Sequence, residues 1–266
     1  LLQVMPFYHT NGLLNQILLP LAVGARVTLL SHFEPRSFLN ALAETQPTYF
    51  TAVPTMLTRL LEYDIPQAGV KNLRFIRSGA APLLPDAHRR IEAHFGCDVV
   101  VSYGQTETTC TNTANPPAAR KIGSVGQALK GREIAILSTA NALAEKTGLS
   151  GEVCLRGPCN AMGNVGEPAF DSTKWLRTGD YGFLDDEGYL FLTGRLKDII
   201  IRGGSNVPPR QSEDCLLGDK GIAEVSVFGV PDADLGEVPV ACVVPSGLAP
   251  LKLSDLIDRI AGALSP

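Results

Sequence analysis

The sequence carries few charges and no excess of positive charge. Charged residues make up 19% of its 266 residues, and the formal net charge is -4. Lys and Arg are mixed with Asp and Glu along the chain and form no basic stripe. Proteins that bind nucleic acids do so through clustered positive charge. The charge pattern therefore predicts no nucleic-acid partner.

A long uninterrupted hydrophobic run is also missing. The longest apolar stretch, 13–30, is interrupted by Asn15, Gln16, Pro20 and Arg26. A helix that crosses a bilayer needs about 18 or more nearly continuous apolar residues. We therefore expect no membrane span. No basic segment with a small-residue cleavage site opens the sequence, so we expect no secretory signal either.

The cysteines lack the paired two-residue spacing of zinc sites, and the histidines do not cluster with them, so a zinc site is not expected. Scattered single thiols in an enzyme-sized chain indicate the cytoplasm or another reducing compartment. We expect Cys154 and Cys159 in the core, because free cysteine packs as a small hydrophobic residue. The six cysteines are Cys97, Cys110, Cys154, Cys159, Cys215 and Cys242.

Apolar residues, in contrast, are abundant: they make up 45% of the sequence, enough for a sizeable core and more than one folding unit. In the first hundred residues, short β-branched or apolar runs alternate with helical stretches. This alternation predicts right-handed βαβ crossovers and a parallel sheet. The predicted strands are 27–30, 49–53, 73–77 and 99–102, and the predicted helices are 37–45, 55–63 and 85–95.

Turn-rich segments follow three of these strands. They are 54–55, the segment Gly79, Ala80, Ala81 and Pro82, and 104–107. Parallel strands point the same way, and open α/β sheets bind ligands at the carboxyl ends of their strands. We therefore expect the three segments to share one cleft.

The pattern changes twice further along the chain. From Gly123, short strands at 133–137, 151–156 and 188–192 indicate antiparallel structure. After Lys197, strands at 199–201, 225–230 and 238–244 and helices at 212–217 and 253–264 form a compact β/α pattern. The predicted fold class is thus α/β: a parallel βαβ part (1–122), an antiparallel β-rich part (123–196) and a small α+β C-terminal domain (197–266).

Three short motifs carry the candidate chemistry. In the first, Gly104 would let the backbone approach a ligand beside the aromatic face of Tyr103. Thr106 offers a hydroxyl that can reach phosphate, and Glu107 is the hard oxygen donor that magnesium prefers. Taken alone, the five residues 103–107 would also fit a turn with a helix-initiating Thr or a solvated Glu.

The second motif places Asp180 after Thr178 and Gly179, where we expect a tight bend. A carboxylate suits the paired hydroxyls of a ribose, although a turn-capping Asp is the commoner explanation for such a tripeptide. The third motif, 194–198, contains Arg195 and Lys197. It would also fit a charged hairpin ahead of an edge strand.

The order, spacing and flanks of these motifs resemble the adenylate-forming enzymes, which include acyl-CoA synthetases, luciferases and peptide-synthetase adenylation domains. His9 after Pro6 and two aromatic residues, Gln105 and the run 197–200 favour the acyl-CoA synthetase branch. The resemblance implies that a carboxylic acid attacks the α-phosphate of ATP to give an acyl-adenylate, which coenzyme A then converts into a thioester. The implied cofactors are ATP, Mg2+ and coenzyme A.

The resemblance also implies roles for single residues. Tyr103 would lie near adenine, Thr106 would contact the α-phosphate and Glu107 would bind magnesium. Asp180 and Arg195 would hold the ribose, with Lys197 as the hinge of a mobile C-terminal domain. The segment Gly79, Ala80, Ala81 and Pro82 matches the loop on the adenine side, and His9 and Gly104 match positions at the acyl site.

The match has departures. The family's phosphate loop would precede the segment matching Leu1, its catalytic Lys would follow the segment matching Pro266, and Ser205 and Gln211 replace acidic residues. The sequence corresponds to roughly half of a full enzyme of this kind. Two hypotheses stay open: an acid:CoA ligase, or a truncated, inactive nucleotide-binding or interaction module. Aliphatic, aromatic and short dicarboxylic acids, and the oligomeric state, also stay open.

Overall fold

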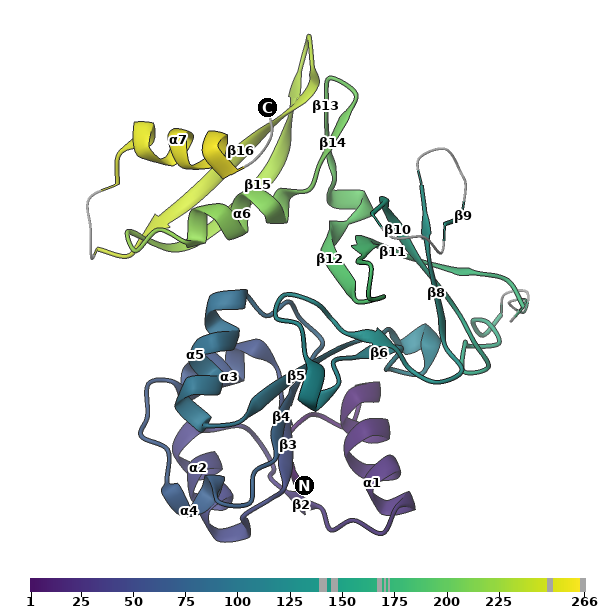
Figure 1. The fold of residues 1–266 in the computed structure, drawn as a ribbon, viewed down its shortest axis with the longest axis vertical. Helices are drawn as coiled ribbons and strands as arrows, with labels where there is room; N and C mark the ends of the chain where they lie inside the picture. The colour runs from purple at the N-terminus through teal and green to yellow at the C-terminus, as the bar shows by residue number, and fades with distance from the viewer. Residues whose placement is uncertain are drawn as a thin grey trace. The chain divides into compact units, whose positions relative to one another are not determined.

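The computed structural model describes residues 1–138, 143–144, 148–166, 169, 171, 173–247 and 251–263. The chain forms two compact units (Figure 1). The first comprises Leu1–Leu149, Cys154–Thr178 and Leu184–Phe191, and the second comprises Ser150–Val153, Gly179–Phe183 and Leu192–Pro266. The predicted domain ranges, with a boundary at Lys197, stay predictions.

A mixed sheet forms the centre of the first unit. Its strands follow the order β2-β1-β3-β4-β5-β6-β7. The neighbours from β2 to β5 are parallel, whereas β5 pairs with β6, and β6 with β7, antiparallel. The strands are β1 (Leu2–Gln3), β2 (Thr28–Leu29), β3 (Tyr49–Ala52), β4 (Phe75–Ser78), β5 (Asp98–Tyr103), β6 (Thr113–Ala114) and β7 (Gln127–Ala128).

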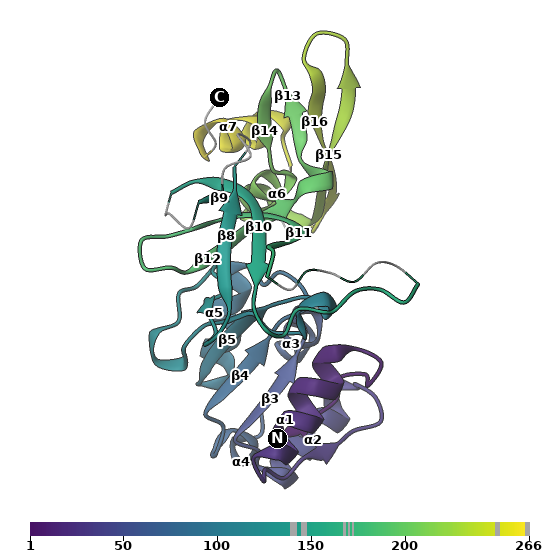
Figure 2. The ribbon, with the colours of Figure 1, turned by 90° about the vertical axis from the view of Figure 1, so that its right-hand side faces the viewer.

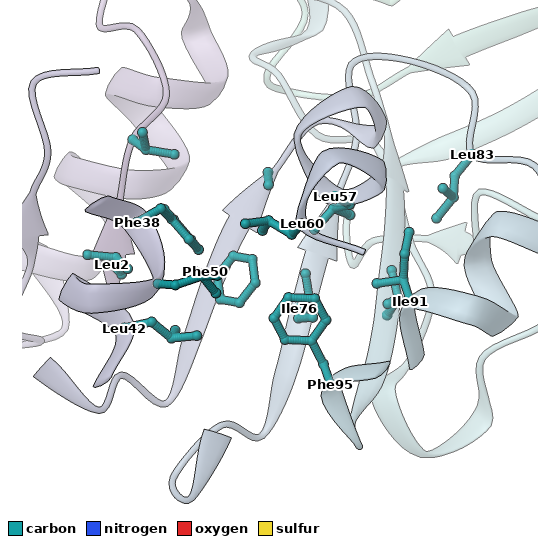
Figure 3. Packing of buried hydrophobic residues seen from close by; sticks show 14 of the residues in the cluster. Leu2, Phe38, Leu42, Phe50, Leu57, Leu60, Ile76, Leu83, Ile91 and Phe95 are labelled. Carbon is teal, nitrogen blue, oxygen red and sulfur yellow. The ribbon is translucent and has the colours of Figure 1, made fainter. Parts of the chain in front are cut away.

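Helices α2 (Pro35–Thr45), α3 (Pro54–Leu60) and α5 (Pro85–Phe95) cover one face of this sheet, with α4 (Gln67–Val70) beside α2 (Figure 1). Their apolar residues meet those of the strands in one core cluster (Figure 3). At its centre Phe50 lies edge-on to Phe38, with ring centroids 5.1 Å apart, and 5.7 Å from Phe95. Burial of such side chains is the main stabilising contribution to a fold of this kind.

The opposite face of the sheet carries a different helix. The π-helical segment η1 (Asn11–Leu18) continues into α1 (Leu19–Ala22), and both lie across the sheet from α2, α3 and α5 (Figure 1, Figure 2). Neither β1 nor this helix is among the sequence predictions. Polar residues within 11–18 and Pro20 interrupt the apolar pattern there, and β1 is too short to give a periodic signal.

A second sheet has the strand order β12-β11-β10-β8-β9. Its strands are β8 (Glu133–Leu137), β9 (Leu143–Ala144), β10 (Ser150–Arg156), β11 (Leu176–Leu184) and β12 (Leu190–Arg195). The prediction of a tight bend at Thr178 to Asp180 is wrong, because these residues lie inside β11. Gly179 has a positive φ of 72°, and its N–H donates to Glu152 Oε1 at 3.0 Å, so the irregularity is absorbed within the strand.

A third sheet, in the order β14-β13-β16-β15, belongs to the second unit. Its strands are β13 (Ile200–Arg202), β14 (Ser205–Val207), β15 (Ile222–Asp232) and β16 (Gly236–Pro245), accompanied by α6 (Pro209–Leu217) and α7 (Leu253–Ala263). The buried residues Ile200, Leu216, Ile222 and Val227 form its core. Leu264, in the predicted last helix, lies outside the described residues.

The fold class is therefore confirmed as α/β with a parallel sheet followed by antiparallel structure. Of the two cysteines expected in the core, Cys154 is buried but Cys159 is exposed, because it lies beyond the end of β10. None of the helices in the described ranges is long and apolar enough to cross a membrane.

Candidate active site

The segment 103–107 is held in place by its backbone. β5 ends at Tyr103, and a short 3-10 turn, η2 (Thr106–Thr108), follows. The N–H groups of Thr108 and Cys110 both donate to the carbonyl of Gln105, at 3.2 and 2.9 Å. The N–H of Asn112 donates to the carbonyl of Tyr103 at 2.8 Å. The loop conformation is therefore fixed without contributions from the side chains of Thr106 and Glu107.

Gly104 lies where two backbone segments meet. A Cβ atom on Gly104 would be 1.8 Å from the carbonyl oxygen of Cys110 and 2.9 Å from Cα of Thr111. The returning segment achieves this approach through two successive left-handed residues, Thr109 with φ 55° and Cys110 with φ 73°. Only glycine has room at position 104.

Thr106 and Glu107 are exposed, whereas Thr108, which follows them in the same turn, is buried. Glu107 and Gln105 line a cavity of about 560 Å³. Two hydrogen bonds join this loop to the far wall: Gln105 Nε2 donates to the Thr178 carbonyl at 2.9 Å, and the Ala161 N–H donates to the Glu107 carbonyl at 2.7 Å. The lining residues are Gln105, Glu107, Asn160, Ala161, Asn164, Asp171, Lys174, Trp175, Leu176, Arg177 and Thr178.

Trp175 lines this cavity, but it is not among the site residues predicted from the sequence. Trp175 is the single tryptophan of the chain, and the Arg156 guanidinium lies 4.4 Å from the centre of its ring. This distance is that of a cation–π contact. The sequence did offer a signal for this residue: a single tryptophan that lies three positions before Thr178.

The loop after β4 lies at the same edge of the sheet as the loop after β5, because the two strands are parallel and in register. Gly79 is buried, and a Cβ there would be 3.0 Å from the Ser102 carbonyl oxygen. Ala80 has a left-handed φ of 67°, and Ala80, Ala81 and Pro82 are exposed. Neither this loop nor 54–55 is among the residues that line the 560 Å³ cavity.

The second unit holds the remaining predicted nucleotide contacts. Asp180 on β11 is 7% exposed, and its Oδ1 lies 3.3 Å from Nε of Arg195 at the end of β12. The Arg195 side chain is 63% exposed. Lys197 follows in an exposed 3-10 turn, η4 (Leu196–Asp198). The structure thus brings Asp180 and Arg195 together.

His9 lies two residues before the start of the η1 helix. Its carbonyl accepts the Leu13 N–H at 3.1 Å, and its exposed ring lies 4.6 Å from the ring of Tyr8. Gly12 is required nearby, since a Cβ at that position would be 2.1 Å from the Pro6 carbonyl oxygen.

One further charged residue was missed. Arg77 interrupts the apolar strand β4, and burial lowers the pKa of its guanidinium. A charged residue inside a predicted strand was the signal that could have found it.

Two family profiles match the sequence. The profile of the AMP-binding enzyme covers residues 1–164, and that of the AMP-binding enzyme C-terminal domain covers residues 211–266. The chain belongs to the AMP-binding enzyme family. The resemblance drawn from the three motifs is thereby confirmed.

Several similar proteins are CoA ligases of about twice this length. The sulfoacetate–CoA ligase of Cupriavidus necator is 37% identical over 250 residues, covering 91% of this chain and 48% of the relative. The oxalate–CoA ligase of Arabidopsis thaliana is 36% identical over 253 residues, covering 91% and 49%. The crystal structure of ATP-bound MatB from Rhodopseudomonas palustris matches with a TM-score of 0.90 at 33% identity, covering 99% of this chain and 53% of that one. The chain spans about half the length of the relatives it matches.

Magnesium accompanies ATP in phosphoryl chemistry, where one or two carboxylates, substrate phosphates and water hold the ion. Among the described residues, no group of three His, Cys, Asp or Glu side chains could hold a metal by itself. Magnesium bound with ATP needs only one or two carboxylates from the protein. Glu107, an exposed carboxylate on a fixed loop at the cavity, could be one of them. The residues present are thus compatible with a metal that the nucleotide brings with it.

Proposed function

We propose that the protein containing this chain is an ATP-dependent acid:CoA ligase that forms an acyl-adenylate and then a CoA thioester. The observation that supports it most is the arrangement at 103–107. A loop whose backbone is fixed by hydrogen bonds presents Thr106 and Glu107 outward, next to a cavity of about 560 Å³. Membership of the AMP-binding enzyme family, which includes CoA ligases, supports assigning this arrangement to adenylate formation.

The proposed roles follow from what each side chain offers. The Thr106 hydroxyl donates to the α-phosphate, and the Asp180 carboxylate accepts hydrogen bonds from the ribose hydroxyls. Tyr103 presents its ring to adenine above the 79–82 loop, and Arg195 orients Asp180 and the ribose. Lys197, in the exposed turn after β12, is the proposed hinge.

Charge is the main obstacle to the first step, because a carboxylate must approach a polyphosphate. Glu107 would hold magnesium, which when bound offsets part of this charge. The proposed part of the chain is to position the two reactants. The turn at Gly104 sets the position of the backbone, and His9, which matches the segment leading into the acyl pocket of acyl-CoA synthetases, would contribute to the acyl site.

The names of the relatives suggest which kind of acid to test, but they do not identify the substrate of this protein. Two are named for sulfoacetate and oxalate, small acids with two acidic groups each. Small anionic acids are therefore the first substrates to test, before aliphatic and aromatic ones.

The test is acid-dependent release of pyrophosphate by the whole protein. We expect release with at least one acid and its loss in an Asp180→Ala variant. Release that continues unchanged in this variant would contradict the proposed site.

Two departures favour a second possibility, an inactive module that binds nucleotide. Ser205 and Gln211 stand where the family resemblance leads one to expect acidic residues, and both are exposed. On this alternative, neither the whole protein nor the chain alone would form an adenylate. Trapping an acyl-hydroxamate in the presence of hydroxylamine would eliminate it.

A further inference from the structure

Arg77 occupies an unusual position for a positive charge. It lies on β4, where its neighbour Ile76 belongs to the core cluster beneath α2, α3 and α5. Side chains alternate between the faces of a strand, so Arg77 points to the opposite face, on the side of η1. Its partner residues across the sheet are Thr51 on β3 and Val100 on β5.

The polar side chains that the structure shows in contact with the Arg77 guanidinium are neutral. Nε donates to Ser102 Oγ at 3.1 Å, and Nη2 donates to Thr111 Oγ1 at 2.7 Å. With the Asn15 amide turned to satisfy its hydrogen bonds, its oxygen accepts from both terminal nitrogens of Arg77 at 3.1 Å. Within the described ranges, no carboxylate forms an ion pair with this guanidinium.

A mostly buried cation without a counter-charge is costly, because neutral dipoles replace only part of its hydration. Burial accordingly lowers the pKa of Arg77. Such a charge is retained where an anion arrives to pair with it, and a guanidinium fork matches a carboxylate or sulfonate with two parallel hydrogen bonds. Arg77 keeps some exposed surface for such a contact.

Neighbouring buried groups also lack partners. Thr51, directly opposite Arg77 in the register of β3 and β4, is 1% exposed, and its hydroxyl has no hydrogen-bond partner among the residues that the structure describes. Gln16, next to Asn15 on η1, is fully buried, and neither polar atom of its amide has a partner in that part of the chain. Native proteins satisfy nearly all buried polar groups, so an unsatisfied hydroxyl directly opposite a buried cation points to a polar ligand.

This polar cluster adjoins the proposed active site. Thr111, which accepts from Arg77, is the residue whose Cα approaches Gly104 closely enough to exclude a Cβ. Arg77 also precedes the buried Gly79 by two positions along the same strand and loop. An acid with its reacting carboxylate near Gly104 therefore needs only a short spacer to place a second group at Arg77.

We propose that Arg77 binds a second anionic group of the substrate acid, so that the substrate is a short acid with a carboxylate at one end and a carboxylate or sulfonate at the other. This inference rests on the proposed ligase function for the identity of the first carboxylate. Ser102, Thr111 and Asn15 orient the guanidinium, and Thr51 and Gln16 supply further polar contacts.

The test compares matched acids on the whole protein. Malonate with propionate, and succinate with butyrate, differ by one anionic group at equal carbon number; oxalate and sulfoacetate extend the set. We expect Arg77→Gln to lower kcat/KM for the preferred dianionic acid by roughly 30-fold or more, and for its monoacid partner by less than about threefold. Arg74→Gln removes the same charge from an exposed position and should change neither.

A folding role makes a different prediction. If Arg77 only supports the structure, or pairs with a carboxylate elsewhere in the whole protein, Arg77→Gln would lower the melting temperature and slow all acids equally. Either result, or a wild-type protein that prefers monoacids, would overturn the inference. We expect an unchanged or higher melting temperature, since the variant removes an unpaired buried charge.

A binding measurement without turnover separates this inference from the proposed function. Calorimetric titration with the same diacids in the absence of ATP should show binding to the wild type and to Arg74→Gln, and none to Arg77→Gln. Binding that depends on Arg77, together with no pyrophosphate release from any acid, would support the anion site and refute the ligase. Pyrophosphate release from monoacids with no diacid binding would support the ligase and refute the anion site.

Discussion

Asp180 and Arg195 form an ion pair in which one partner is buried and the other is not. Asp180 is 7% exposed, and its Oδ1 lies 3.3 Å from Nε of an Arg195 side chain that is 63% exposed. Because solvent screens the guanidinium, the pair contributes little to stability. Its effect is to orient a carboxylate that is otherwise enclosed. The carboxylate should therefore matter more for binding than for folding.

Replacing Asp180 with Ala tests this expectation. The loss of two charge-assisted hydrogen bonds to a ribose should weaken ATP binding at least about tenfold. The measurement is calorimetric titration with ATP. Asp186→Ala, at an exposed position in the turn after β11, removes the same charge and should leave the affinity unchanged. Equal affinities in all three proteins would show that Asp180 does not contact the nucleotide.

Replacing Glu107 with Gln should raise the magnesium concentration needed for half-maximal pyrophosphate release by about tenfold or more, since the amide is a weaker ligand. The fold should be intact, because Glu107 contacts Ala161 through its backbone carbonyl, and its carboxylate forms no hydrogen bond with the residues that the structure describes. Magnesium titrations of the wild type, Glu107→Gln and the exposed control Glu62→Gln measure this. An unchanged magnesium requirement in Glu107→Gln would remove Glu107 from the proposed metal site.

Replacing Gly104 with Ala should destabilise the protein by about 3 kcal/mol or more, because the new Cβ would be 1.8 Å from the Cys110 carbonyl oxygen. Gly194→Ala is the matched control: its Cβ would meet only ordinary contacts, at 3.8 Å from Pro208 and 3.9 Å from Ile199. Urea unfolding measures both. A Gly104→Ala protein as stable as the control would show that the close approach is relieved at little cost.

The stability of the first unit should depend on pH through His88. This residue is fully buried on α5, and its Nε2 lies 3.2 Å from Glu92 Oε1. Burial lowers the pKa of His88, which outweighs the raising effect of Glu92. The unfolded chain then binds a proton near pH 6.5 that the folded chain does not. The stabilising contribution of neutral His88 is therefore complete above pH 6.5, and it is lost as the pH falls below that value.

The measurement is the free energy of unfolding in urea between pH 5.5 and 8, a range above the ordinary titration of Glu92 at about 4.3. His88→Gln should have a shallower pH dependence than the wild type below pH 6.5. His32→Gln, which changes an exposed histidine, should retain the wild-type dependence. A wild-type slope in His88→Gln would assign the pH dependence to other groups.

The sequence was informative where local pattern and tertiary structure agree. The strand at 98–103 contains the apolar run 99–101 and is followed by Gly104, and the helix at 85–95 repeats its apolar residues with helical spacing. Both elements were therefore predicted within a residue or two. The helix at 11–22 was missed because Asn15 and Gln16, polar in the sequence, face the sheet. Their environment depends on strands far away in the chain.

The site followed the same rule. Thr106, Glu107 and Asp180 were predicted from short motifs and stay predictions as site residues. The bend expected at Asp180 was wrong, because pairing within β11 overrides a local turn preference. The sequence could mark Arg77 as a charge inside a predicted strand, but it could not supply the residues that surround it. Its partners come from η1, β5 and the segment after η2, and no local spacing records their meeting.

The separation of backbone and side chain at 103–108 has a practical consequence. Because hydrogen bonds from Thr108, Cys110 and Asn112 hold the loop, side chains at 106 and 107 are free to change without disturbing the chain around them. Variants changed at these two positions should therefore keep the native loop conformation, so that any loss of nucleotide binding in them can be assigned to the missing side chains themselves.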